Sequence, residues 1–125
     1  VIEELAEIRS WCEAIASPSA RRLALVAFSS IIVAVSKQDS DTRYVRRDKG
    51  LRSGDTMRRF ARALRDATDA VREFTAVCES RFRALVLEAD LLSKPPVGEV
   101  DLVVCSPPYP NAYSYHLYHR TRMLW

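Results

Sequence analysis

Glycine is scarce in this chain, which has only three among its 125 residues. A complete nucleotide-binding domain of alternating strands and helices usually needs more glycine for its phosphate-binding turns. The chain also begins at Val1 without an initiator Met and stops at an apolar, aromatic end at Trp125. These features favour the interpretation that the chain is an internal part of a longer protein. A small processed protein is the alternative.

Cysteine is also rare, and Cys12, Cys78 and Cys105 show no CxxC spacing. This pattern excludes a disulfide framework and gives no zinc signature. A reducing, cytoplasmic compartment fits it best. His116 and His119 are one helical turn apart but have no third ligand nearby, so we expect no metal site. We expect Cys105 to be a buried structural thiol.

Long apolar runs are missing too. The longest, residues 23–35, is too short to cross a bilayer, so we expect a buried helix and no membrane partner. Helical periodicity predicts one helix over residues 1–16 and a second from Pro18 to about residue 36, capped by Ser17. The second helix should be almost fully buried.

Residues 37–55 are polar, basic and aperiodic, which predicts a long loop. A third helix should come after it, with Asp55 as its N-cap. We expect its apolar stripe to face the core. The stripe consists of Met57, Phe60, Ala61, Leu64, Ala67, Val71, Phe74, Val77 and Cys78.

Positive charge is concentrated between residues 41 and 65. This segment has a net charge of +6, although the whole chain has only +3. Such asymmetry suits a polyanionic partner, and a solvated surface is the alternative. We expect four basic residues of the loop to contact phosphates: Arg43, Arg46, Arg47 and Lys49.

Two short aliphatic runs lie beyond the helices, at residues 83–90 and 100–105, separated by a linker that contains Pro95, Pro96 and Gly98. Continuous aliphatic runs are typical of buried parallel strands, which need crossover helices. The sequence therefore predicts part of an α/β, doubly wound domain with a large helical insertion. We expect a helical segment over residues 1–81 and part of the α/β core over residues 82–125.

The second run ends in the sequence SPPY, residues 106–109. Pro107 and Pro108 terminate the strand and stiffen the turn after it, because proline cannot donate to a sheet. Ligands of open parallel sheets bind beyond the carboxyl ends of the strands. The Ser106 hydroxyl and the Pro107 carbonyl would there form a rigid pair of acceptors beside the Tyr109 ring. Such a pair can hold the hydrogens of an exocyclic amino group while the ring stacks on a flipped base.

The stretch DLVVCSPPYPNAYSYHLYH, residues 101–119, resembles motif IV of the DNA amino-methyltransferases. Enzymes of this family transfer a methyl group from S-adenosyl-L-methionine to cytosine-N4 or adenine-N6 within a Rossmann-like domain. The form with Ser is most similar to the cytosine-N4 enzymes. The resemblance also implies DNA as partner and a restriction endonuclease as a counterpart. Its strong part covers about the last quarter of the chain.

By this resemblance, Ser106 is the side-chain acceptor, Pro107 the carbonyl acceptor, Pro108 the residue that sets the turn, and Tyr109 the stacking ring. Asp90, which ends the preceding predicted strand, falls where similar enzymes place a polar residue near the adenine of the cofactor. A strand-end cap is the alternative for Asp90.

One departure from the family pattern concerns the cofactor. Related enzymes carry a glycine-rich FxGxG-type motif that binds S-adenosyl-L-methionine, and no such motif occurs in this chain. We therefore expect the chain alone to bind the cofactor poorly and to be inactive.

Other interpretations of the sequence stay open. The same chemistry could act on an RNA base or a protein glutamine, and the basic segment favours nucleic acid over protein. The chain could also be a non-catalytic, nucleic-acid-binding helical module. A polyproline ligand for a recognition domain is disfavoured, because the prolines come directly after an apolar run.

Overall fold

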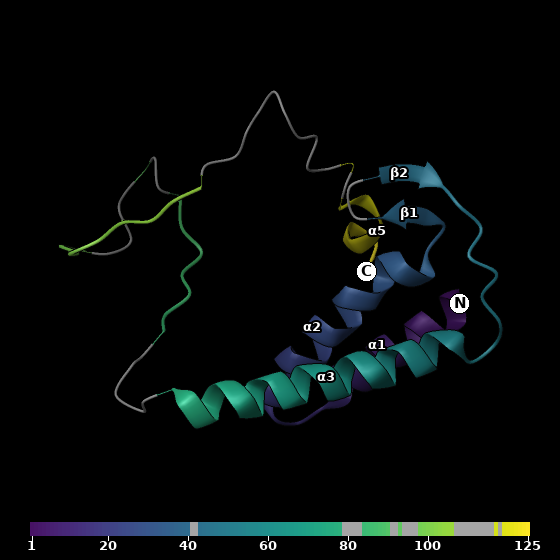
Figure 1. The fold of residues 1–125 in the computed structure, drawn as a ribbon, viewed down its shortest axis with the longest axis horizontal. Coiled ribbons are helices and arrows are strands. Elements are labelled where there is room, and N and C mark those ends of the chain that lie inside the picture. The colour runs from purple at the N-terminus through teal and green to yellow at the C-terminus, as the bar shows by residue number, and fades with distance from the viewer. Residues whose placement is uncertain (41–42, 79–83, 91–92, 94–97, 107–116, 118) are drawn as a thin grey trace.

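The computed structural model describes residues 1–40, 43–78, 84–90, 93, 98–106, 117 and 119–125. Three long helices form the body of the molecule, and a short antiparallel hairpin lies at one end of it (Figure 1). The elements are α1 (Ile2–Ala14), α2 (Pro18–Val35), β1 (Gln38–Ser40), β2 (Arg43–Arg46), α3 (Asp55–Val77) and α5 (Arg120–Met123).

The turn between α1 and α2 forms as the sequence predicts. Pro18 is the first residue of α2, where its missing N–H costs nothing, and the Ser17 hydroxyl accepts a hydrogen bond from the Ala20 amide at 3.5 Å. The Arg21 Nε donates a hydrogen bond to the Ile15 carbonyl at 2.9 Å, so this carbonyl at the end of α1 has a partner. These contacts reverse the chain and place α1 against α2.

The core lies where α1, α2 and α3 meet. Trp11 of α1 and Phe60 of α3 make an edge-to-face contact with ring centroids 5.8 Å apart, and Phe28 of α2 makes a similar contact with Trp125 at 6.0 Å. Burial of Cys12 between the helices raises the pKa of its thiol. The buried core side chains are Leu5, Ile8, Cys12, Ala24, Ala27, Phe28, Ile31, Ile32, Val35 and Phe60.

Helix α2 supplies most of this core, as its composition predicts, but it is not buried all round. Val26 is 63% exposed, whereas Phe28 and Ile32 are buried. Among the described residues, α2 is the one helix whose length and apolar composition would suffice to cross a membrane. Its packing against α1 and α3 is that of a core helix, and this arrangement is consistent with a soluble protein.

The predicted loop over residues 37–55 contains a hairpin that the sequence analysis missed. β1 and β2 pair antiparallel, with Gln38 opposite Arg46 and Ser40 opposite Arg43. The strands are only three and four residues long, which is too short for an alternating pattern to reveal them. The Thr121 hydroxyl fixes the hairpin to the end of the chain, because it donates to the buried Gln38 side chain at 2.8 Å.

Helix α3 begins one residue earlier than expected. Gly54 is its N-cap with φ +83°, a left-handed conformation that glycine adopts without strain, and Asp55 is the first helical residue. The Asp55 carboxylate accepts a hydrogen bond from the Arg52 amide at 2.7 Å. Asp55 therefore stabilises the turn before the helix, and the prediction that it is the N-cap is wrong by one position.

The apolar stripe of α3 is core over only part of its length. Phe60 is buried and Leu64 packs against the core, whereas Val71, Phe74 and Val77 are 49%, 67% and 80% exposed. The second half of α3 extends past the turn between α1 and α2 (Figure 1). The prediction that the whole stripe is core is therefore wrong for this half, because no described element reaches it.

The two predicted strands are not formed in the described residues. Residues 84–90 and 98–106 have no regular secondary structure and lie apart from the helices (Figure 1). Their side chains are exposed, with Val86 at 94% and Val104 at 86%. A buried parallel strand needs hydrogen-bonded neighbours along its edges, and no described segment supplies them. The described residues are mostly helical, and the α/β class stays a prediction.

Glu4 joins the start of α1 to the start of α3. Its Oε1 accepts a hydrogen bond from the Gly54 amide. Glu4 Oε2 and the hydroxyl of the fully buried Thr56 make no hydrogen bond of standard geometry with any described residue, yet they lie close enough to interact electrostatically. The Thr56 hydroxyl and the Gly54 amide together lower the pKa of Glu4 below its ordinary value.

A pH dependence of stability is expected from this cluster. Because the pKa of Glu4 is lowered by folding, its carboxylate stabilises the fold above about pH 4.5, the ordinary pKa of the group. This stabilisation is lost as the pH falls through the pKa of Glu4 in the folded protein. We expect Glu4→Gln to lower the melting temperature at pH 7 and to have a smaller effect at pH 3. Thermal melts at both pH values check this, with the exposed Glu3→Gln as control. An equal effect at both pH values would contradict it.

Candidate functional site

Ser106 is the last described residue before the rest of the predicted motif, and its side chain is exposed. No residue that the structure describes makes a hydrogen bond to its hydroxyl. Pro107, Pro108 and Tyr109 lie outside the described residues, so their predicted roles stay predictions. Cys105 is exposed, and the expectation of a buried thiol is wrong, because the run that precedes it is not covered by a sheet.

Asp90, the predicted cofactor contact, lies in a local turn with Ser93. The Ser93 hydroxyl donates to the Asp90 carboxylate, and the Ser93 amide donates to the Asp90 carbonyl at 3.2 Å. This is the geometry of a local turn stabilised by a side chain, and no strand precedes it in the described residues. Its predicted role at the cofactor stays a prediction.

The predicted phosphate-binding residues divide into two groups. Arg43 and Arg46 begin and end β2, Arg47 comes directly after it, and all three are exposed. Asp39 lies among them, 3.0 Å from the Arg47 guanidinium and 4.0 Å from that of Arg43. The Asp39 side chain is mostly covered, but both guanidinium groups are largely exposed, so solvent weakens their attraction to it. The three side chains can therefore turn toward a polyanion.

Lys49 belongs to the second group and has a structural position. Its Nζ donates to the Val33 carbonyl at 2.6 Å, so it covers the carboxyl end of α2, where the helix dipole favours a cation. The structure thus brings Arg43 and Arg47 together at Asp39, places Arg46 exposed on the same strand, and directs the Lys49 side chain toward the bundle.

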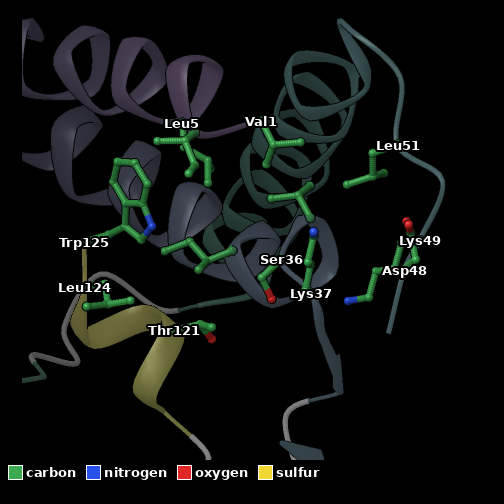
Figure 2. A pocket seen from close by; sticks show the side chains of 13 residues that line it. Val1, Leu5, Ser36, Lys37, Asp48, Lys49, Leu51, Thr121, Leu124 and Trp125 are labelled. Atoms are coloured by element: carbon green, nitrogen blue, oxygen red, sulfur yellow. The ribbon is translucent and has the colours of Figure 1, made fainter. Parts of the chain in front are cut away.

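A mainly apolar cavity of about 510 Å³ lies beside Lys49. Figure 2 shows Leu124 and Trp125 on one side of the cavity and Asp48, Lys49 and Leu51 on the other. Segments far apart in the chain form its wall, so no local sequence pattern could reveal it. Ser106, the predicted catalytic residue that the structure describes, does not line this cavity.

A second, basic hollow of about 410 Å³ lies between α2 and α3. Three arginines of the first turns of α3 line it together with two aspartates and a few small apolar side chains. Its lining residues are Ile31, Ala34, Asp55, Arg58, Arg59, Arg62, Ala63 and Asp66. No local sequence pattern could reveal this hollow, because it depends on how the helices pack.

No metal site is evident in the described part of the chain, where no group of three or more His, Cys, Asp or Glu side chains is arranged to hold an ion. His116 lies outside the described residues. That the two histidines form no metal site therefore stays a prediction.

Comparison with known proteins gives no family. No protein-family model, no curated protein and no solved structure matches this chain.

Proposed function

We propose that this chain is the central part of an S-adenosyl-L-methionine-dependent DNA amino-methyltransferase that acts on cytosine-N4 in preference to adenine-N6. The observation that carries the proposal is the sequence VDLVVCSPPY, residues 100–109, in which an aliphatic run ends on a serine, two prolines and a tyrosine. Expression of the complete reading frame in a host without DNA methylation, followed by mass spectrometry of DNA nucleosides, tests it.

The exposure of the aliphatic runs supports this proposal. Val86, Leu102 and Val104 are all more than three-quarters exposed, which is costly for aliphatic side chains in water. Strands of a parallel sheet bury such side chains on both faces. We infer that residues 84–87 and 102–105 become strands when further segments of the same domain pair with them.

The chemistry that we assign to this chain is the positioning of the target amino group. Its lone pair is delocalised into the base ring, which makes the nitrogen a weak nucleophile. The Ser106 hydroxyl oxygen and the Pro107 carbonyl would accept its two hydrogens and leave the lone pair directed away from the ring. Tyr109 would hold the flipped base flat, so that most of the rate gain comes from orientation.

The cofactor would supply an electrophilic methyl group when it is bound, and the described residues show no place for it. The glycine-rich motif is absent, and Asp90 is engaged in its turn with Ser93. We therefore assign no step to cofactor-binding residues of this chain. The proposal places such residues elsewhere in the complete protein, which would act in the cytoplasm.

A non-catalytic, nucleic-acid-binding module is the second candidate. The observation that favours it is the helical bundle, which has its own core and displays exposed arginines on β2 and α3. Methyl transfer by the complete protein distinguishes the two candidates, because a binding module would give none.

The arginines of β2 give a prediction that both candidates share. We expect the triple variant Arg43→Gln, Arg46→Gln, Arg47→Gln to bind DNA duplexes more weakly, whatever their base sequence. The slope of log affinity against log salt should fall by about 0.9 for each phosphate contact that is lost. Fluorescence anisotropy between about 50 and 200 mM salt measures this slope.

Lys49→Gln is the matched control for this prediction. It removes one positive charge but also the contact with the Val33 carbonyl, so we expect it to lower the melting temperature and to leave the salt slope almost unchanged. An unchanged slope in the triple variant would show that these arginines form only a solvated surface.

A further inference from the structure

The hollow between α2 and α3 has the form of an anion site. Arg59 and Arg62 line it from α3, and Ile31 and Ala34 of α2 form an apolar part of its wall. Its volume of about 410 Å³ is more than ten times the roughly 30 Å³ that one water molecule occupies in the liquid. A phosphate with its attached sugar therefore has room to enter.

The charges in the hollow are unequally satisfied. Asp55 accepts hydrogen bonds from the Arg52 amide and the Arg58 guanidinium, which lower its pKa, and the nearby charges of Arg58 and Arg59 lower it further. Asp66, the other carboxylate that lines the hollow, lies about one turn beyond Arg62 on the same helix. Within the described part of the chain, neither Arg59 nor Arg62 makes an ion pair or a side-chain hydrogen bond.

The spacing of these two arginines suits one phosphate. Residues three apart on a helix lie on the same side, with Cβ atoms about 5–6 Å apart. Two arginines whose Cβ atoms are this far apart can direct the N–H donors of their guanidinium groups at one tetrahedral anion. The apolar wall strengthens the attraction, because it excludes water from one side.

We propose that Arg59 and Arg62 bind a backbone phosphate of DNA in this hollow, which would give the protein a phosphate contact separate from the arginines of β2. The proposal rests on DNA as the substrate, as proposed above. A backbone phosphate carries no sequence information, so this contact would position the duplex and would not select the site to be modified.

The test compares two double variants of the whole chain. Arg59→Gln, Arg62→Gln removes both guanidinium groups from the hollow. Arg65→Gln, Arg72→Gln removes the same charge from exposed positions of α3 that do not line it, and Arg72 already pairs with Asp69 at 3.2 Å. Affinity for a DNA duplex is measured by anisotropy at several salt concentrations, and thermal melts confirm that both variants are folded.

We expect the hollow variant to weaken binding about tenfold and to reduce the salt slope by about one, with a much smaller change in the control variant. Equal losses in both variants would overturn the proposal, since they would reflect net charge alone. A wild-type chain without salt-dependent affinity for DNA would overturn it as well.

The failure of this contact and of the proposed reaction are distinguishable. If the complete protein methylates DNA but the hollow variant binds like the control, only the phosphate contact is wrong. If the salt slope of DNA binding falls in the hollow variant but the complete protein produces no methylated base, the phosphate contact is confirmed and the proposed reaction is wrong.

Discussion

Replacing Ser106 with alanine in the complete protein should lower methyl transfer by about 10²–10³-fold, the loss typical for removal of one group that stabilises a transition state by a hydrogen bond. Affinity for DNA should change little, because the hydroxyl would contact only the flipped base. The measurement is transfer of a radiolabelled methyl group from the cofactor to a DNA duplex under single-turnover conditions.

Cys105→Ser is the control that gives this experiment its meaning. Cys105 is exposed beside Ser106, so a thiol nucleophile is the obvious alternative to direct transfer. Direct transfer predicts that Cys105→Ser keeps its activity while Ser106→Ala loses it. If the cysteine variant is inactive and the serine variant is active, the reaction passes through the thiol and the assignment of Ser106 is wrong.

Phe60→Ala should destabilise the chain by about 3–5 kcal/mol, the usual cost of truncating a buried phenylalanine. Phe60 is 7% exposed, contacts Trp11 and lines an apolar groove between α1 and α3, so its loss would also enlarge an existing space. Chemical denaturation followed by circular dichroism measures the difference in the free energy of unfolding.

Phe74→Ala is the matched variant on the same apolar stripe. Phe74 is 67% exposed in the chain, so its truncation should change the stability by no more than about 0.5 kcal/mol. Equal costs at both positions would show that something covers the second half of α3.

The helical half of the chain could be predicted because its signals are local. Ser17 and Pro18 mark the start of α2, and the periodicity of Leu5, Ile8 and Cys12 identifies the buried face of α1. These features depend on the 3.6-residue repeat and on cap chemistry, and both can be read from a short segment of the sequence. The bounds of the three long helices are accordingly close to those expected.

The remaining elements depend on contacts between distant residues. The hairpin of β1 and β2 is held by Thr121 through Gln38, a contact that no local pattern announces. The hollow that contains Arg59 and Arg62 exists only because α2 and α3 cross beside it. The aliphatic runs around Val86 and Val104 have strand-like composition, but composition alone cannot supply the neighbouring strands that a parallel sheet requires.

The sequence of the predicted catalytic motif likewise gives its residue types but not their arrangement in space. Its chemistry is carried by residue types in a fixed order, which the sequence contains in full from Ser106 to Tyr109. The arrangement of two acceptors and a stacking ring around a base is a property of the folded strand end. It therefore stays a prediction that activity measurements have to decide.

The most direct measurement is an analysis of the nucleosides in DNA from a methylation-free host that expresses the complete reading frame. Mass spectrometry should find N4-methylcytosine that is absent from the empty host and from a host that expresses the Ser106→Ala variant. N6-methyladenine in its place would confirm methyl transfer to DNA and correct the target base. No new methylated base in the presence of a folded, DNA-binding protein would contradict the proposed reaction.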